Sequence, residues 1–297
     1  MKTARILQII LFLSFLLSIN VTLSAQGGTP SLRETMIRDQ EDRWNRSREF
    51  PRLHKNRTFD TLAAREELRA KATAKDLRAI AVSAEDKDKF AGFLKHPRTG
   101  IFRLHDISNC HESNRVYNVE EPCPLHVAAK GSAYSFTERD YEFKLLADIF
   151  LEKDNFRIRK IETLSFLTDL GDLPLENLTL ASSGIREMAE FVPSLDKKQV
   201  IAQAAIATRG FQVGKHIYKT SRPMKENSTY ALRSITYRFE NENISVKTKR
   251  LDIVVIFRVV RKYEDGSVLV VWKELQRKDA PKLMDKKFVA QDFRSQR

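Results

Sequence analysis

The residue types best suited to chemistry gather in one stretch, which runs from Arg103 to His126 and reads RLHDISNCHESNRVYNVEEPCPLH. It holds both cysteines of the chain and three of its six histidines. Thiolates and imidazoles serve as nucleophiles, as general bases and as ligands for metal ions. The spacing of these residues supports two interpretations, a disulfide or a metal site.

A disulfide between Cys110 and Cys123 is the first interpretation. These are the only two cysteines, they lie close together in the sequence, and the leader described below indicates export into an oxidising compartment. Closing such a loop stabilises a fold by about 3 kcal/mol in the chain-entropy model. We therefore expect one structural disulfide.

A zinc site is the second interpretation, because the Cys-x-x-His spacing at Cys123 and His126 suits two ligands of a tetrahedral site. His105, His111 and His126 are its candidate imidazole ligands. Two features weigh against it: an oxidising compartment consumes thiols, and the first half of the cluster lacks a matching pair. We expect no metal and no other cofactor.

Signatures of common enzymes are missing from the sequence. It contains no G-x-S-x-G elbow, no H-E-x-x-H motif and no paired C-x-x-C motif. The segment GFQVGKH after residue 209 superficially resembles a phosphate loop, but its glycines are too close together and His216 follows the lysine. We assign no catalytic residue. An exported hydrolase with a site near the Cys110 to His126 loop is the alternative to a non-catalytic protein.

Basic residues with an aromatic neighbour are the other chemical feature. The chain carries a formal charge of +13, which favours anionic partners. The candidate anion-binding residues are Arg258, Arg261, Lys262, Trp272 and Lys273. The alternative is that these charges protect a sheet edge from aggregation. The partner would be an anionic envelope polymer or lipid surface, and we expect no nucleic acid because the leader exports the protein.

Residues 1–26 have the three-part plan of a secretory signal peptide. Lys2 and Arg5 precede an apolar core, and small residues follow at the expected cleavage region, Ala25 to Gly27. An N-terminal membrane anchor is the alternative, because Ile6 to Leu23 approaches the roughly 20 apolar residues that span a bilayer. We expect an exported soluble protein, periplasmic or extracellular, with a binding or structural role.

The elements that must position these residues are centred on Leu251 to Leu275, the strongest β-branched run after the leader. Asp265-Gly266 divides this run, which predicts a β-hairpin. Apolar residues occupy odd and even positions alike, so we expect each strand to be covered on both faces at its centre.

The register of this hairpin depends on its turn. A two-residue loop would place Arg258 opposite Lys273, an unfavourable pair of like charges. A three-residue loop, Glu264 to Gly266 with Gly266 left-handed, would place Arg258 opposite Trp272, where the guanidinium could lie on the ring. We predict the three-residue loop and this pairing.

The remaining pattern divides the chain in two. Residues 27–96 are charged and helical, with a helix start at Ser83, and residues 97–297 are rich in strands. The clearest helix of the second region is Asp196 to Thr208, with Gly210 as its stop. Tyr141 to Glu152 fits either a strand or a helix. The sequence predicts an α+β fold: an antiparallel sheet of hairpins with helical cover, preceded by a helical N-terminal arm.

One further strand has a distinct pattern. Phe156, Ile158 and Lys160 alternate with Arg157, Arg159 and Ile161. Successive side chains of a strand point to opposite faces. We therefore expect this strand to be half exposed, with a basic outer edge.

Overall fold

The computed structural model describes residues 61–110, 123–160, 163–237 and 250–283. The expected signal peptide, its alternative as a membrane anchor and His111 all lie outside the described residues. Among the helices within these ranges, none is long and apolar enough to cross a membrane.

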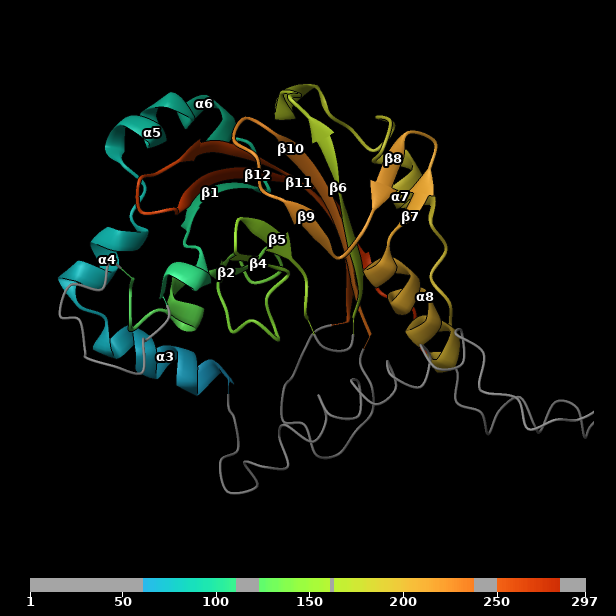
Figure 1. Cartoon of the computed structure of the whole chain (residues 1–297), viewed down its shortest axis with the longest axis horizontal. Coiled ribbons are helices and arrows are strands. Elements are labelled where there is room, and N and C mark those ends of the chain that lie inside the picture. The colour runs from blue at the N-terminus through green and yellow to red at the C-terminus, as the bar shows by residue number, and fades with distance from the viewer. Residues whose placement is uncertain (1–60, 111–122, 161–162, 238–249, 284–297) are drawn as a thin grey trace, which may run out of the picture. The chain divides into compact units, whose positions relative to one another are not determined.

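Two antiparallel sheets form the body of the fold (Figure 1). The first sheet has the strand order β1-β12-β11-β10-β6, with β1 Thr99–Leu104, β12 Val268–Asp279, β11 Leu251–Lys262, β10 Thr229–Thr236 and β6 Thr163–Gly171. The second sheet has the order β3-β2-β4-β5-β9, with β3 Asp140–Tyr141, β2 Ala133–Ser135, β4 Ile149–Glu152, β5 Asn155–Arg157 and β9 Ser221–Pro223. The predicted antiparallel α+β architecture is confirmed.

The main core lies between the two sheets. Phe257 of β11 contacts Phe136 after β2 and Phe156 of β5, with ring centroids 5.7 and 5.1 Å apart. Ile253, Val255 and Phe257 all belong to this core. Their odd positions place them on one face of the strand. The β-branched run that begins at Leu251 therefore forms the inner side of the first sheet.

A second core covers the opposite face of the first sheet. Val254 and Ile256 of β11 belong to it, together with buried residues of α7 (Arg186–Glu190) and α8 (Lys197–Arg209). β11 is therefore covered on both faces at its centre, as its sequence predicts. A small hairpin of β7 (Phe211–Val213) and β8 (His216–Tyr218) completes this layer.

Helix α8 forms where the sequence predicts it. The Asp196 side chain caps its N-terminus by accepting a hydrogen bond from the Gln199 amide, 2.9 Å away. Gly210, with φ of 99°, ends it. Val200 and Ala207 are buried in the second core, so one face of the helix packs on the sheet.

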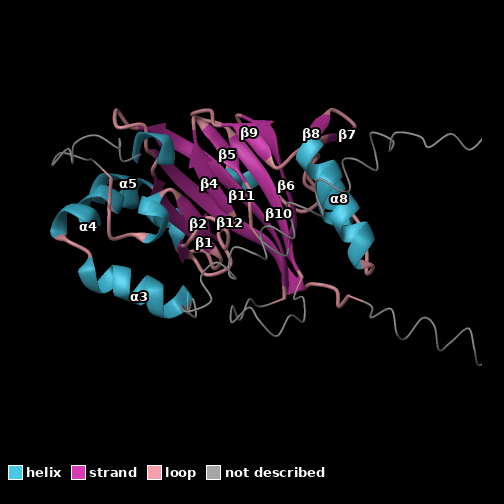
Figure 2. Ribbon diagram, turned by 60° about the horizontal axis from the view of Figure 1, so that its bottom comes forward, coloured by secondary structure: helices cyan, strands magenta, loops and turns pink. Residues whose placement is uncertain are grey.

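Between residue 61 and β1 the structure describes four short helices: α3 (Thr61–Lys71), α4 (Ala74–Ile80), α5 (Ala84–Lys89) and α6 (Ala91–Leu94). In both views α3 and α4 lie toward β1, whereas α8 lies on the side of β6 (Figures 1 and 2). Ser83 caps α5 as expected, accepting a hydrogen bond from the Asp86 amide at 3.0 Å. Phe90 and Phe93 pack against the second core.

The ambiguous stretch from residue 141 to 152 contains turns followed by β4, not one helix. Ala147 and Ile149 are both buried there. Ala147 and Ile149 belong to different clusters of buried residues. Apolar residues of this stretch therefore occur at both strand-like and helix-like spacings, and periodicity could not distinguish a strand from a helix.

The β11–β12 hairpin has the predicted loop but not the predicted pairing. Tyr263 N donates to Ser267 O at 2.8 Å around the three-residue loop, and Gly266 has φ of 78°. Val260 is then an extra residue in β11, and the register shifts by one. Arg258 consequently lies opposite Val271, and Trp272 lies opposite Phe257, so the predicted Arg258–Trp272 pair is wrong.

Candidate functional site at the disulfide and hairpin tip

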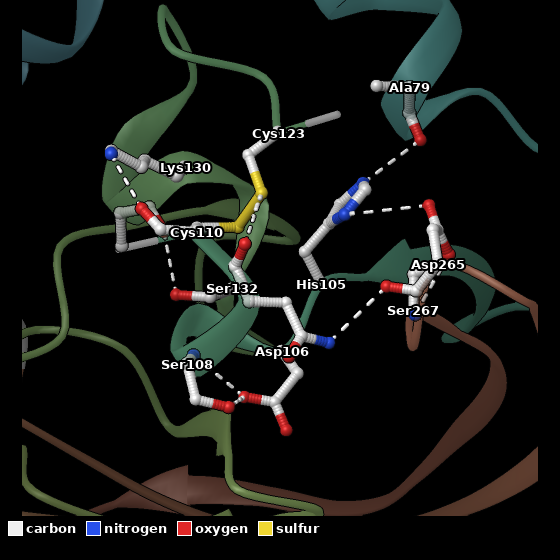
Figure 3. Close-up of a disulfide and its surroundings, with 12 residues drawn as sticks. Ala79, His105, Asp106, Ser108, Cys110, Cys123, Lys130, Ser132, Asp265 and Ser267 are labelled. Carbon is white, nitrogen blue, oxygen red and sulfur yellow. Dashed lines mark hydrogen bonds and ion pairs between the residues drawn. A yellow bond between two sulfur atoms is a disulfide. The ribbon is translucent and has the colours of Figure 1, made fainter. Parts of the chain in front are cut away.

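Cys110 and Cys123 form the expected disulfide (Figure 3). Cys110 ends a 3-10 helix, Ile107–Cys110, that follows β1. Both cysteines are buried, and Ile107 packs with them in a small cluster of its own. The bond therefore closes a loop onto the end of β1 beside the sheet sandwich.

His105 lies next to the disulfide and is only 2% exposed. Its Nε2 lies 3.1 Å from the Ala79 carbonyl oxygen, and its Nδ1 lies 3.9 Å from Oδ2 of Asp265 (Figure 3). A carbonyl oxygen only accepts, so Nε2 carries the proton. Burial lowers the pKa of His105, outweighing the opposite effects of the Ala79 carbonyl and Asp265. The neutral ring thus links the end of α4 to the hairpin tip.

The hairpin tip is held by Arg103 of β1. Its Nη2 donates to Asp265 Oδ2 at 2.8 Å, and its Nε donates to Ser267 Oγ at 2.7 Å. Ser267 in turn donates to Asp265 Oδ1. Burial acts to raise the pKa of Asp265, but the hydrogen bonds from Ser267 and the charge of Arg103 hold it below its usual value. Ser267 and Asp265 therefore hydrogen-bond to each other and to Arg103. Neither forms a nucleophile–base pair with His105.

Tyr263 ties the same tip to the N-terminal helices. The Arg103 guanidinium lies 4.1 Å from the centroid of its ring, and Arg261 lies 5.8 Å from it. The Tyr263 hydroxyl donates to the buried Asp86 of α5 at 3.3 Å, and Arg261 reaches the same carboxylate at 3.2 Å. The hairpin tip is thus a junction between β1, α5 and the disulfide loop.

Asp106 is a further buried carboxylate at this junction. It accepts hydrogen bonds from the amides of Ser108, Lys153 and Asp154 at 2.8, 2.9 and 2.7 Å, and from the Ser108 hydroxyl. Lys153 and Asp154 have φ of 53° and 51°, the left-handed values that a tight β4–β5 turn requires. Asp106 therefore fixes the turn of the second sheet against the disulfide loop.

A left-handed turn lies on the other side of the disulfide. Ala129, Lys130 and Gly131 have consecutive positive φ values of 49°, 53° and 67°. Lys130 Nζ donates to the Cys110 carbonyl at 2.8 Å, and the Gly131 carbonyl accepts from His105 N at 2.9 Å. Left-handed conformations of non-glycine residues persist only where surrounding contacts fix them. Here those contacts come from the disulfide loop and His105.

The metal hypothesis meets two obstacles in this geometry. Ligand atoms of His105, Cys110 and Cys123 lie within 4.8 Å of one another, which is the spacing of a metal site. However, the sulfurs are joined to each other, and both nitrogens of His105 face oxygen atoms. The backbone of His126 lies near Asp76, whose Oδ1 is 3.4 Å from the His126 amide. The arrangement is that of a structural cross-link.

The candidate anion-binding residues do not form one stripe. Trp272 is 1% exposed and lies in the main core, so its ring is closed to a ligand. Lys273 is its neighbour on β12, paired with Ile256. The other three cations each have a carboxylate partner: Arg258 with Asp172 at 2.7 Å, Arg261 with Asp86 at 3.2 Å and Lys262 with Asp154 at 2.9 Å. The structure instead places Arg157 at the end of β5 and the exposed Arg159 two residues after it, where the sequence predicts a basic outer edge.

Comparisons with known proteins add no family. No protein-family profile, no curated protein and no solved structure matches this chain.

One pair of groups escaped the sequence analysis. Ser183, which is exposed, lies with its Oγ 3.0 Å from Nε2 of His216 on β8. The pKa of His216 is lowered by burial and by the charge of Lys215, whereas Glu187 acts in the opposite direction. The two residues are far apart in the sequence and no motif surrounds either of them, so only the packing of β8 on the segment before α7 shows the contact.

Proposed function

We propose that this protein is exported and acts as a non-catalytic binding or structural protein of the cell envelope or extracellular space. Its partner would be anionic, either an envelope polymer or a lipid surface. The disulfide supports an oxidising compartment, and the formal charge of +13 supports an anionic partner.

One observation carries the non-catalytic part of the proposal. Among the described residues of the disulfide region, His105, Asp106 and the two cysteines are used in internal bonds. His105 faces the Ala79 carbonyl and Asp265. Asp106 accepts hydrogen bonds from the amides of Ser108 and Lys153, and the two thiols are joined in a disulfide. An active site needs polar groups that converge on a substrate, whereas these groups converge on one another. They make the region a rigid junction.

The experiment is a binding measurement on the purified protein with its disulfide intact. Long-chain polyphosphate and vesicles containing an anionic phospholipid serve as the two probes, each titrated at low and high salt. Electrostatic binding should weaken steeply as salt rises. Binding that ignores salt, or no binding to either probe at low salt, would exclude an anionic partner.

A hydrolase is the second candidate function, and the Ser183–His216 contact is the observation that favours it. Neutral His216 could accept the Ser183 hydroxyl proton while Oγ attacks an acyl carbon, and then return that proton to the leaving alcohol. This site would lie on the segment before α7, away from the Cys110 to His126 loop.

A fluorophosphonate probe tests the hydrolase directly, because it labels activated serines. An active site predicts labelling that Ser183→Ala and His216→Gln both abolish and that the matched control Ser182→Ala leaves intact. An unlabelled wild-type protein would remove this candidate and leave the binding proposal standing.

A further inference from the structure

Three cations and one carboxylate lie on the outer face of the second sheet, and two of these cations pair with the carboxylate. The cations are Lys144, Arg157 and Arg159, and the carboxylate is Glu152 of β4. Lys144 Nζ and Arg157 Nε each lie 3.4 Å from an oxygen of Glu152. We call these three cations with Glu152 the β5 face.

The strand pairing explains why these residues share a face. Arg157, the last residue of β5, lies opposite Phe150 of β4. Glu152 is two residues further along β4, and Arg159 follows two residues after the end of β5. Side chains two apart in a strand point to the same side. Phe156 and Ile158 between them are buried on the inner side. The alternation that predicts a basic outer edge therefore holds through Arg159.

An apolar floor supports the cations. Phe150 is fully buried and packs with Ala133 and Ala147 beneath them. Lys144 Nζ lies 5.0 Å and the Arg159 guanidinium 5.7 Å from the centroid of the Phe150 ring. The charged ends of both side chains therefore lie over the face of the ring. The ring thus holds two cations close together despite their repulsion.

The charges of this face are not balanced. Glu152 is shared by Lys144 and Arg157, and Arg159 contacts no carboxylate among the described residues. By contrast, each of the three cations of β11 has a carboxylate to itself. The β5 face therefore keeps a net positive charge, and the exposed Arg159 offers its guanidinium to an outside partner.

We propose that the β5 face binds a linear anionic polymer through its phosphate groups. This inference rests on the proposed anionic partner and assigns the surface that binds it. The guanidinium of arginine matches phosphate with two parallel hydrogen bonds. Arg157 and Arg159 lie two residues apart in the chain, and both lie beside Phe150, so they offer two neighbouring guanidinium groups to successive phosphates of a polymer. A polymer can place consecutive phosphates on both groups.

The test compares two variants that lose the same charge. The first is Lys144→Gln, Arg157→Gln and Arg159→Gln together. The second removes three exposed lysines elsewhere, Lys75, Lys87 and Lys198, also by Gln substitution. Affinity for long-chain polyphosphate is measured between about 50 and about 200 mM salt, with thermal unfolding as the check on folding.

The β5-face variant should bind roughly tenfold or more weakly, and the slope of log affinity against log salt should fall by about 2, as expected for three lost phosphate contacts. The lysine variant should keep both the affinity and most of the slope. Glu152→Gln, which removes the one carboxylate, should bind more tightly than the wild type. This last variant keeps the test decisive if the triple variant folds poorly.

The outcomes separate the two proposals. Equal losses in the two triple variants, with no gain from Glu152→Gln, would overturn the β5 face while leaving an anionic partner in place. Wild-type binding to anionic vesicles but not to polyphosphate would overturn the polymer assignment. No wild-type binding to either probe would overturn the proposed function itself.

Discussion

Arg233 of β10 and Asp252 of β11 form an ion pair through two parallel hydrogen bonds, 2.9 and 2.8 Å long, and each residue is at most 1% exposed. The same guanidinium donates to the carbonyls of Met188 and Phe191, both at 2.7 Å. Arg233 therefore joins the first sheet to the C-terminal end of α7, where helix carbonyls lack partners of their own.

Replacing Arg233 with Met should lower the free energy of unfolding by about 3 to 5 kcal/mol, because the buried Asp252 carboxylate loses both hydrogen bonds and keeps only Lys278, 3.6 Å away, as a cation near it. Urea unfolding at neutral pH measures the loss. Arg258→Met is the matched control, since Arg258 pairs with the exposed Asp172 and should cost about 1 kcal/mol or less. Equal losses in the two variants would contradict a special role for the buried pair.

Acid should destabilise the protein through its bonded carboxylates. Burial acts to raise the pKa of Asp106, but its hydrogen bonds from Asp154, Ser108 and Lys153 lower it below the usual value of 3.8. A carboxyl group with a lowered folded pKa contributes full stability above its unfolded pKa and loses it as pH falls through the folded value. Stability should therefore fall progressively below about pH 4.

Asp106→Asn tests this assignment. The variant should be about 1.5 to 3 kcal/mol less stable at pH 7, because it loses hydrogen bonds to a charged acceptor. It should also lose less stability than the wild type when pH is lowered below 4. Parallel pH curves for the two proteins would show that other carboxylates carry the acid sensitivity.

The disulfide should contribute about 3 kcal/mol. We expect the Cys110→Ala, Cys123→Ala variant to unfold at a correspondingly lower urea concentration. Protection of the Gly131 and Lys130 amides from hydrogen exchange should fall as well, because the left-handed turn depends on this loop. Unchanged protection there would mean that the turn is fixed by other contacts.

Much of the scaffold could be predicted from the sequence because the decisive signals are local. Asp265-Gly266 fixes the loop of the long hairpin, apolar residues on both faces of β11 indicate two layers of cover, and Asp196 with Gly210 bounds α8. The predicted register was wrong because Val260 is an extra residue in β11 that shifts the pairing with β12 by one. A β-branched run looks the same with or without such an irregularity, so the sequence carries no sign of it.

The candidate site could be predicted only in part. Cys110 and Cys123 were sufficient for the disulfide, and alternation along β5 was sufficient for a basic edge. The role of Trp272 was not accessible, because its burial depends on Phe136 and Tyr134 of the second sheet. The pairing of Arg258, Arg261 and Lys262 with carboxylates likewise depends on elements far apart in the chain. Such contacts arise when separate layers pack together, and the residue pattern of one strand does not indicate them.

His105 provides the last prediction. Burial lowers its pKa below the usual 6.5, so in the window below that value the unfolded chain binds a proton that the folded protein excludes. Stability should therefore decrease as pH falls through 6.5, until the folded ring itself is protonated. His216 has a shift of the same sign, so each histidine must be removed in turn. Urea unfolding at pH 7.5 and 5.5 should show a smaller pH effect in His105→Gln than in the wild type. His216→Gln should retain the part of the pH effect that is due to His105.

An NMR titration in which His105 is protonated above pH 6.5 would reverse the expected pH dependence of stability. Asp265 and the Ala79 carbonyl would then outweigh burial in setting the pKa of His105, and acid would raise the free energy of unfolding instead of lowering it.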